Sequence, residues 1–309
     1  MTLINKDIRD IFFENIRKIF LKHKDFFILT NDADVFALHK IKNHERFIDA
    51  GVCEQNLINI ASGLSKKKKK VLVYGFCNFL CHRAYEQIKI NIGSMNLPVT
   101  IVGIGPGFSF SYDGPTHHGI QDISNIYTIP EFEIINLADN LLADYSSRNI
   151  LKIKRPTYFR LEKGVCSSNF KESNYQDGYK YYKILRKDIL VISTGYFSQI
   201  AKNIFLETKK FSLIDIFSLK NFNKKKLKNI ISEYNKILIY DENTLSGGIS
   251  PILNTFFLEN TLTKKNYTYL TVPENQIFKY YQNRDEMHKI LGIDSVSLKK
   301  KIKQLVSKN

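Results

Sequence analysis

Hydrophobic residues near the start of the chain follow two different spacings. Between residues 7 and 21 they recur every three or four positions with charged residues between them, which predicts an amphipathic helix. Residues 26–30 are almost all apolar and lead into a polar stretch at 31–34, which predicts a buried strand that ends in a loop.

The alternation of helix and strand continues along the chain. Helices are predicted over residues 54–64 and 79–92, and strands over 71–74 and 99–104. This order implies parallel strands joined by crossover helices, a fold that binds ligands outside the carboxyl ends of its strands. We therefore predict a first α/β domain over residues 1–168.

A second domain follows a polar segment. Between Cys166 and Tyr179 the periodicity is lost and Ser, Asn, Lys, Glu, Gln and Asp collect, which is typical of a surface linker. Beyond it, strands are predicted at 189–193, 211–216 and 236–240, and helices at 198–208 and 226–234. The predicted fold class is thus α/β, with two doubly wound domains, the second over residues 180–309.

The composition agrees with two folded domains and adds a basic charge. The chain has 309 residues, of which 43% are hydrophobic, enough for about two domains of ~150 residues. A net charge of +16 is compatible with nucleic-acid binding, but the lysines are spread along the chain apart from the run at 66–70, and no nucleic-acid-binding motif accompanies them. Sugar phosphates are a simpler explanation of the charge. We expect no nucleic-acid partner, although a basic nucleic-acid binder stays an alternative.

Targeting and metal signals are weak. The N-terminus lacks the apolar core of a signal peptide, and no apolar stretch approaches the ~18 residues of a membrane helix. Cys77, Cys81 and His82 lack a second pair of metal ligands elsewhere. We expect a cytoplasmic protein that has no membrane contact and no metal ligands of its own.

The first chemical motif is residues 46–56, Arg-Phe-Ile-Asp-Ala-Gly-Val-Cys-Glu-Gln-Asn, which break at Gly51 into a helix starting near Glu54. Alone, a glutamate in a first helical turn indicates only a favourable charge at the helix dipole. The whole stretch, however, resembles the Arg-Phe-Ile-Asp-x-Gly-Ile-x-Glu-Gln-Asn segment of transketolases. The resemblance implies that Glu54 hydrogen-bonds the aminopyrimidine of thiamine diphosphate and drives the tautomer that deprotonates the thiazolium carbon.

A second motif, residues 75–87, is similar to the family's Thr-Phe-x-x-Phe-Leu-x-x-Arg-Ala-Tyr-x-Gln. The resemblance implies that Phe76 and Phe79 wall in the cofactor's pyrimidine ring and exclude water. Without it, two Phe three residues apart would indicate core packing. Arg83 is expected to contact substrate or a structural carboxylate. His82 stands where many transketolases carry an aromatic residue, and its role stays open.

The third motif is residues 112–119, which contain the Asp-Gly-Pro-Thr-His sequence of transketolases and deoxyxylulose-phosphate synthases. An Asp-Gly-Pro turn fixes the backbone, and histidine titrates near neutral pH. The resemblance implies that His117 passes protons to a substrate oxygen and that Asp113 binds a substrate hydroxyl. A loop histidine without a catalytic role stays the alternative for His117, and His118 is expected to be only its neighbour.

Two later segments extend the resemblance. Residues 155–164 are similar to the family's Gly-Pro-x-x-x-Arg-x-x-Arg-Gly strand, which implies a sugar-phosphate contact for Lys163 and a substrate or structural role for Arg160. Residues 242–248 match a Glu-x-x-x-x-Gly-Gly turn of the C-terminal domain, which in the family mainly supports dimer contacts.

One element of the family is absent from the sequence. Gly-Asp-Gly, which marks the diphosphate-binding domain and its Mg²⁺ site, does not occur. The resemblance therefore implies the C-terminal subunit of a split transketolase, which transfers a two-carbon ketol unit between sugar phosphates. Thiamine diphosphate and Mg²⁺ would be held mainly by an N-terminal partner subunit, in a heterotetramer with twofold symmetry.

Two alternatives remain for the function. A deoxyxylulose-phosphate-synthase-like or other sugar-condensing enzyme is disfavoured because residues 104–108 lack the arginine that such synthases usually carry there. A catalytically silent scaffold or regulatory subunit is disfavoured by the presence of Glu54 and His117.

Overall fold

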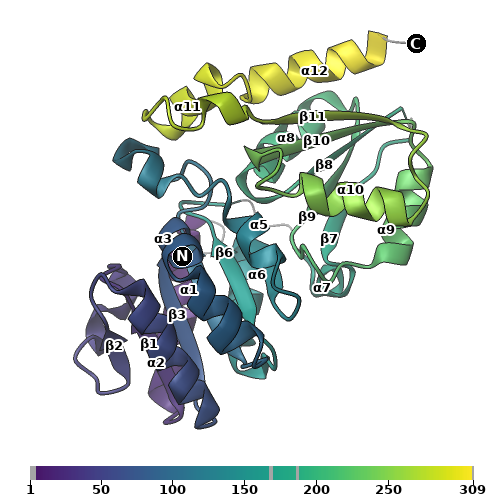
Figure 1. Cartoon of the computed structure of the whole chain (residues 1–309). Coiled ribbons are helices and arrows are strands. Elements are labelled where there is room, and N and C mark those ends of the chain that lie inside the picture. Colours follow the sequence, from purple (N-terminus) through teal and green to yellow (C-terminus); the bar gives the residue numbers. More distant parts are fainter. Residues whose placement is uncertain (1–4, 167–169, 186–187, 308–309) are drawn as a thin grey trace. The chain divides into compact units, whose positions relative to one another are not determined.

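The computed structural model describes residues 5–166, 170–185 and 188–307. By its contacts the chain divides into two compact units. The first contains Met1–Pro106 and Asn125–Lys171, and the second contains Gly107–Ser124 and Glu172–Asn309. Figure 1 labels the elements of both units.

The first unit is built on a parallel sheet whose order is β2-β1-β3-β4-β6-β5. All five neighbouring pairs are parallel. The carboxyl ends of the strands therefore lie at one edge, where an α/β sheet binds its ligands. The strands are β1 (Phe26–Thr30), β2 (Phe47–Asp49), β3 (Lys70–Phe76), β4 (Val99–Ile104), β5 (Glu133–Leu137) and β6 (Thr157–Leu161).

Two groups of helices pack on this sheet. Helix α1 (Ile8–Lys22) packs against α6 (Asn140–Arg148), and α2 (Glu54–Lys66) packs against α3 (Cys77–Arg83). Both α1 and α6 begin after an aspartate, Asp7 or Asp139, whose side chain accepts hydrogen bonds from the first-turn amides.

The helix predicted over 79–92 differs in the structure. It is divided at Ala84 into α3, the short α4 (Tyr85–Gln87) and a π-helical segment over Ile88–Gly93. Hydrophobic spacing does not reveal this division, because the buried residues Leu80, Ala84, Ile88 and Ile92 recur every four positions across it, as they would in one continuous helix.

The second unit has a mixed five-stranded sheet of order β11-β10-β8-β9-β7. Strand β7 pairs antiparallel with β9, whereas the other neighbours are parallel. The short helix α7 (Glu172–Asp177) lies within the predicted linker, and β7 begins at its end. Residues 167–169 of the linker fall outside the described part of the chain. The strands are β7 (Tyr179–Tyr182), β8 (Ile189–Ser193), β9 (Ser212–Ile216), β10 (Lys236–Thr244) and β11 (Asn266–Val272).

Helix α12 (Ser295–Ser307) packs on α8 (Gly195–Thr208), and both contact β8 in the second unit. The sheet also carries α9 (Lys224–Ser232), α10 (Ser250–Glu259) and α11 (Arg284–Ile290). Two α/β domains are therefore present, which confirms the predicted fold class.

One segment leaves the first unit. Residues 107–124 pack on the second unit, where Phe108 and Ile120 are fully buried in its core cluster. This segment carries the Asp-Gly-Pro-Thr-His motif, so two groups of predicted site residues belong to different units.

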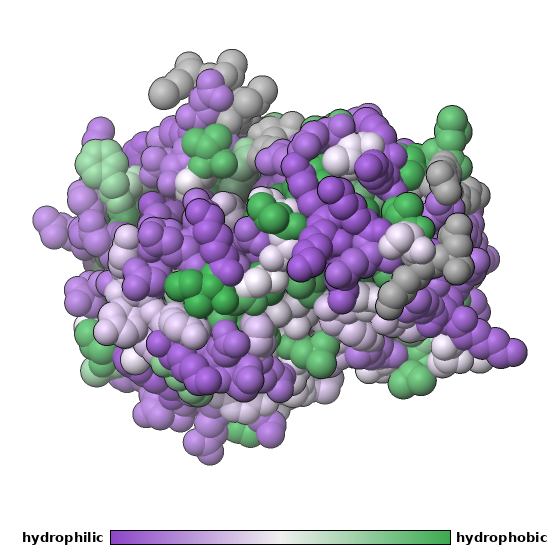
Figure 2. Space-filling model, turned by 90° about the horizontal axis from the view of Figure 1, so that it is seen from above, coloured by the Kyte–Doolittle hydropathy of each residue, from purple (hydrophilic) through white to green (hydrophobic). Residues whose placement is uncertain are grey.

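Figure 2 shows the hydropathy of one face of the surface. In the face of Figure 2, hydrophilic side chains cover much of the area and hydrophobic ones form small separate groups. None of the helices in the described ranges has the length and hydropathy that crossing a bilayer requires.

Candidate functional site

Glu54 is the first residue of α2 and follows the turn at Gly51, whose φ of 65° suits a glycine. Its side chain is buried, with 4% exposed. Its Oε1 accepts hydrogen bonds from Nδ2 of Asn31, at 3.1 Å, and from Nη1 of Arg83, at 2.9 Å. Among the described residues, none donates a hydrogen bond to Oε2 of Glu54. One carboxylate oxygen is thus held and the other is available.

Asn31 is a site residue that the sequence motifs did not identify. It directly follows β1 and is 5% exposed. Gly75 in β3 makes room for it, because a Cβ built on Gly75 would lie 2.0 Å from Oδ1 of Asn31. A polar residue at the end of a buried strand was the available signal. Its side chain fixes the orientation of the Glu54 carboxylate.

Arg83 and the two phenylalanines form a connected group beside Glu54. The Arg83 guanidinium lies 3.9 Å from the ring centre of Phe79. Phe79 in turn makes an edge-to-face contact with Phe76, with 5.7 Å between ring centres. Both rings are half-buried. A half-buried aromatic pair next to a buried carboxylate offers apolar surface to a flat ring.

An open pocket of about 370 Å³ lies beside Glu54 and Arg83. It is bounded by Val52, Cys53, Glu54, Gln55, Asn56 and Arg83. The first turn of α2, including Glu54, therefore lines an accessible hollow of the first unit.

The second unit holds Asp113 and His117 on short 3₁₀ turns at Ser111–Asp113 and Pro115–His117. Asp113 is exposed and His117 is half-buried. Nδ1 of His117 lies 3.1 Å from Oγ1 of Thr116. Gly114 joins the two turns with a φ of 79°, a conformation that favours glycine.

His118 differs from its neighbour. It is 3% exposed, and its ring packs edge-to-face on Phe108 with 5.0 Å between centres. Burial lowers the pKa of His118, so the imidazole is neutral at pH 7. Its Nε2 lies 3.4 Å from the carbonyl oxygen of Ser111. These contacts indicate a packing role for His118.

Arg160 and Lys163 lie on either side of the end of β6. Arg160 is inside the strand and 3% exposed, whereas Lys163 is exposed in the following loop. Lys163 is therefore the more accessible of the two basic side chains in their own unit.

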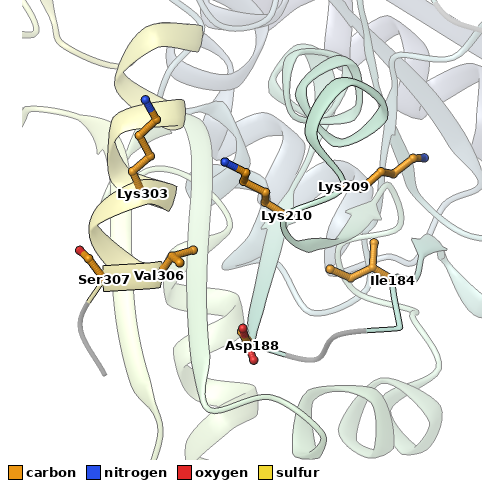
Figure 3. A pocket seen from close by; sticks show the side chains of 7 residues that line it. All are labelled: Ile184, Asp188, Lys209, Lys210, Lys303, Val306 and Ser307. Carbon is orange, nitrogen blue, oxygen red and sulfur yellow. The ribbon is translucent and has the colours of Figure 1, made fainter.

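Another pocket, of about 270 Å³, lies in the second unit and contains none of the predicted site residues. Figure 3 shows that the amino group of Lys209 points away from those of Lys210 and Lys303, so these lysines do not converge on one anion. No group of three or more metal-binding side chains occurs within the residues that the structure describes.

Comparison with known proteins assigns two successive parts of the chain to known domain families. Residues 5–167 match the family described as transketolase, pyrimidine binding domain, and residues 180–297 match transketolase, C-terminal domain.

Relatives that align with most of this chain agree with these domain matches. A protein of Methanocaldococcus jannaschii named as a transketolase C-terminal section is 25% identical, and the alignment covers 99% of this chain and 98% of the relative. One subunit of the apulose-4-phosphate transketolase of Phocaeicola vulgatus is 22% identical over 85% of each chain. The 1-deoxy-D-xylulose-5-phosphate synthase of Oleidesulfovibrio alaskensis is 26% identical over 85% of this chain, which spans only 42% of that enzyme.

A solved structure shows the same fold. A split-gene transketolase, described as an inactive beta4 tetramer, superposes with a TM-score of 0.79 at 20% identity and covers 98% of this chain and 99% of its own. At this identity the likeness concerns the fold alone.

Proposed function

The chain belongs to the transketolase family, and from this premise we propose that it is the C-terminal subunit of a heteromeric, thiamine-diphosphate-dependent transketolase. In this role it takes part in the transfer of a two-carbon ketol unit between sugar phosphates. The observation that carries the proposal is the Glu54 carboxylate, buried at the carboxyl edge of a parallel sheet with one oxygen held and one available.

The residues around Glu54 fit the pyrimidine end of the cofactor. The available Oε2 would hydrogen-bond the ring nitrogen, while Asn31 and Arg83 fix the carboxylate through Oε1. Phe76 and Phe79 would cover the ring and exclude water. When bound, thiamine diphosphate supplies a nucleophilic carbon for attack on a ketose carbonyl. Arg83 would thus orient the Glu54 carboxylate. A contact between Arg83 and substrate, the other role expected for it, would be compatible with this one.

The substrate roles rest on the Asp-Gly-Pro-Thr-His motif and on Lys163. His117 would move a proton to or from a substrate oxygen, and Asp113 would bind a substrate hydroxyl. Lys163, which is exposed, would contact a sugar phosphate as a point charge. Arg160, being buried in β6, would support the strand that presents Lys163.

A second polypeptide is part of the proposal. We expect an N-terminal subunit that carries the Gly-Asp-Gly motif, which this sequence lacks, to hold the diphosphate and Mg²⁺. Two of the similar proteins, the apulose-4-phosphate transketolase subunit and the split-gene transketolase, carry names that support a two-chain enzyme. A twofold heterotetramer is the arrangement that we expect.

The first test is capture of this chain from its native cells, followed by mass spectrometry and an assay of thiamine-diphosphate-dependent ketol transfer. We expect a stoichiometric partner that carries Gly-Asp-Gly, with activity only in the complex. A chain carrying Glu54→Gln should capture the same partner without activity. A chain that stays alone and binds no cofactor would instead support a silent scaffold subunit.

A second candidate is favoured by the similarity to 1-deoxy-D-xylulose-5-phosphate synthases. The captured complex should therefore also be assayed for that product. Synthase activity without ketol transfer would replace the transketolase proposal, while the assignment of Glu54 to the cofactor would stand.

A further inference from the structure

The segment that carries Asp113 and His117 is a closed loop within the second unit. Gly107 and Gly119 form an antiparallel bridge in which each amide donates to the other's carbonyl oxygen at 2.8 Å. The loop between them thus has a fixed base, and the position of its tip depends on what holds that base.

Glu242, in β10, contacts the first residues of this loop. Its Oε1 accepts a hydrogen bond from the amide of Phe108 at 3.3 Å. Gly107 lies so close that a Cβ built on it would be 1.9 Å from Oε2 of Glu242, and its φ of +59° also favours glycine. The glycine therefore allows the carboxylate to reach the loop.

The carboxylate of Glu242 is itself held from α11. Arg284 donates from Nε to Oε1 at 2.8 Å and from Nη2 to Oε2 at 2.5 Å, and His288 Nε2 lies 2.6 Å from Oε1. The guanidinium of Arg284 is 3.7 Å from the ring centre of Tyr196. With 4% of Glu242 exposed, this is a buried and fully occupied carboxylate.

The last residue of β10 and the turn that follows it hold the other end of the segment, near Ile120 and Ser124. The amide of Thr244 donates to the carbonyl of Ile120 at 3.4 Å, and the amide of Ser124 donates to the carbonyl of Gly247 at 3.2 Å. A Cβ on Gly247 would lie 2.5 Å from the Ile120 carbonyl oxygen. The Glu-x-x-x-x-Gly-Gly motif thus contacts both ends of the segment.

We propose that residues 242–248 form a clamp that sets the position of residues 107–119, here called the substrate loop. In this clamp Glu242 is a positioning residue for His117 and Asp113. Glu242 acts on the base of the loop through Gly107 and Phe108, and Gly247 fixes the return of the chain. Only the expected change in enzyme kinetics rests on the proposed function. The contacts of the clamp lie within the second unit and can be tested in this chain alone.

The test compares Glu242→Gln with wild type in two measurements. In the isolated chain, hydrogen exchange of the amides in residues 107–119 should become faster by about tenfold or more. In the assembled enzyme, kcat/KM for the ketose donor should fall by about 10–100-fold, the size expected when a reacting group is displaced by ~1 Å. The affinity for thiamine diphosphate should stay unchanged, because Glu54 belongs to the other unit.

Asp215→Asn is the matched control. Lys180 and Asp215 form another buried ion pair of the second unit, 2.8 Å apart between β7 and β9. Its loss should destabilise the unit but leave the exchange of residues 107–119 and kcat/KM for the ketose donor unchanged. Equal acceleration of loop exchange by both variants would overturn the inference, because the effect would then be general destabilisation.

Gly107→Ala is a second variant in case Glu242→Gln does not fold. The added methyl group displaces the carboxylate from the loop, so it should also accelerate exchange in residues 107–119. Unchanged exchange in Gly107→Ala would contradict the clamp. If the wild-type complex lacks ketol transfer, the proposed function fails, while the exchange measurements still decide on the clamp.

Discussion

Two glutamates, one in each unit, are equally buried yet differ in how their oxygens are used. Glu54 and Glu242 are each 4% exposed, and each pairs with an arginine. Both protein hydrogen bonds to Glu54 fall on one oxygen, next to an open pocket. Glu242 accepts at both oxygens. Burial alone therefore does not distinguish the carboxylate proposed to bind the cofactor from the one proposed to position a loop, whereas the number of occupied oxygens does.

The arginine partners show the same contrast. The side chain of Arg83 is 46% exposed, whereas that of Arg284 is 14% exposed. A cation at an open pocket can adjust to a ligand, while a buried one is confined by its surroundings. We infer that the carboxylate of the first unit is arranged for binding and that of the second for fixed geometry.

The largest expected effect is that of Glu54→Gln on catalysis. The amide keeps an acceptor for Asn31 but loses the charge that the proposed cofactor contact requires. Ketol transfer by the assembled complex should fall by about 10³–10⁴-fold, at the upper end of positioned proton-transfer groups. The free energy of unfolding should change by less than about 1 kcal/mol. Turnover at saturating cofactor measures the loss of ketol transfer, and thermal unfolding measures the change in stability. Glu86→Gln, at an exposed glutamate, is the control, and near-normal turnover in Glu54→Gln would remove the central assignment.

The next largest effect concerns the free energy of unfolding when each arginine is replaced in turn. Arg284→Met leaves the Glu242 carboxylate buried without its ion partner, which should cost about 3–5 kcal/mol. Arg83→Met should cost about 1 kcal/mol or less, because Arg83 itself is half-exposed and the buried Glu54 that it leaves behind lines an open pocket. Hydrogen exchange in increasing urea, resolved by unit, measures both losses. Equal losses would show that the two carboxylates do not differ in the way proposed.

His117→Ala should have a smaller catalytic effect. Removing a group that transfers protons should lower ketol-donor turnover by about 10²-fold, the lower end of such contributions. Thr116→Val removes the hydroxyl 3.1 Å from Nδ1 of His117 and is the control for the loop. Unchanged kinetics in His117→Ala would assign the histidine a structural role only.

Much of the fold could be predicted because it depends on local patterns. The strand over 26–30, the strand over 99–104 and the helix starting at Glu54 agree with β1, β4 and α2. The two strands are short, almost continuous apolar runs, the helix has apolar residues every three or four positions, and a polar or glycine residue follows each element. The antiparallel β7 was not predicted, since its four residues border a polar segment.

The site could be predicted only where motifs carried it. Glu54, Phe79 and Arg83 come together in the first unit, as the motifs suggest. The contact of Asn31 with Glu54, by contrast, depends on how closely the end of β1 approaches Gly75 in β3. Likewise, Glu242 reaches Phe108 across 134 positions of sequence. Such contacts depend on chain topology, which local spacing does not encode.

The smallest expected effect is a pH dependence of the stability that Glu242 provides. Burial alone would raise the pKa of Glu242, but Arg284, together with the hydrogen bond from His288, outweighs it and holds the pKa well below its usual range. A depressed carboxyl pKa stabilises the folded state above the unfolded pKa of about 4.3, and this contribution is lost as pH falls toward the folded value. The difference in unfolding free energy between wild type and Glu242→Gln should therefore be constant from pH 5 to 6, within about 0.5 kcal/mol, and shrink below about pH 4. Denaturant unfolding of both proteins across this range measures the difference, in which other carboxyl groups cancel. A difference that stays constant down to about pH 3 would mean that the folded state does not lower the pKa of Glu242, and the contrast with Glu54 would then rest on geometry alone.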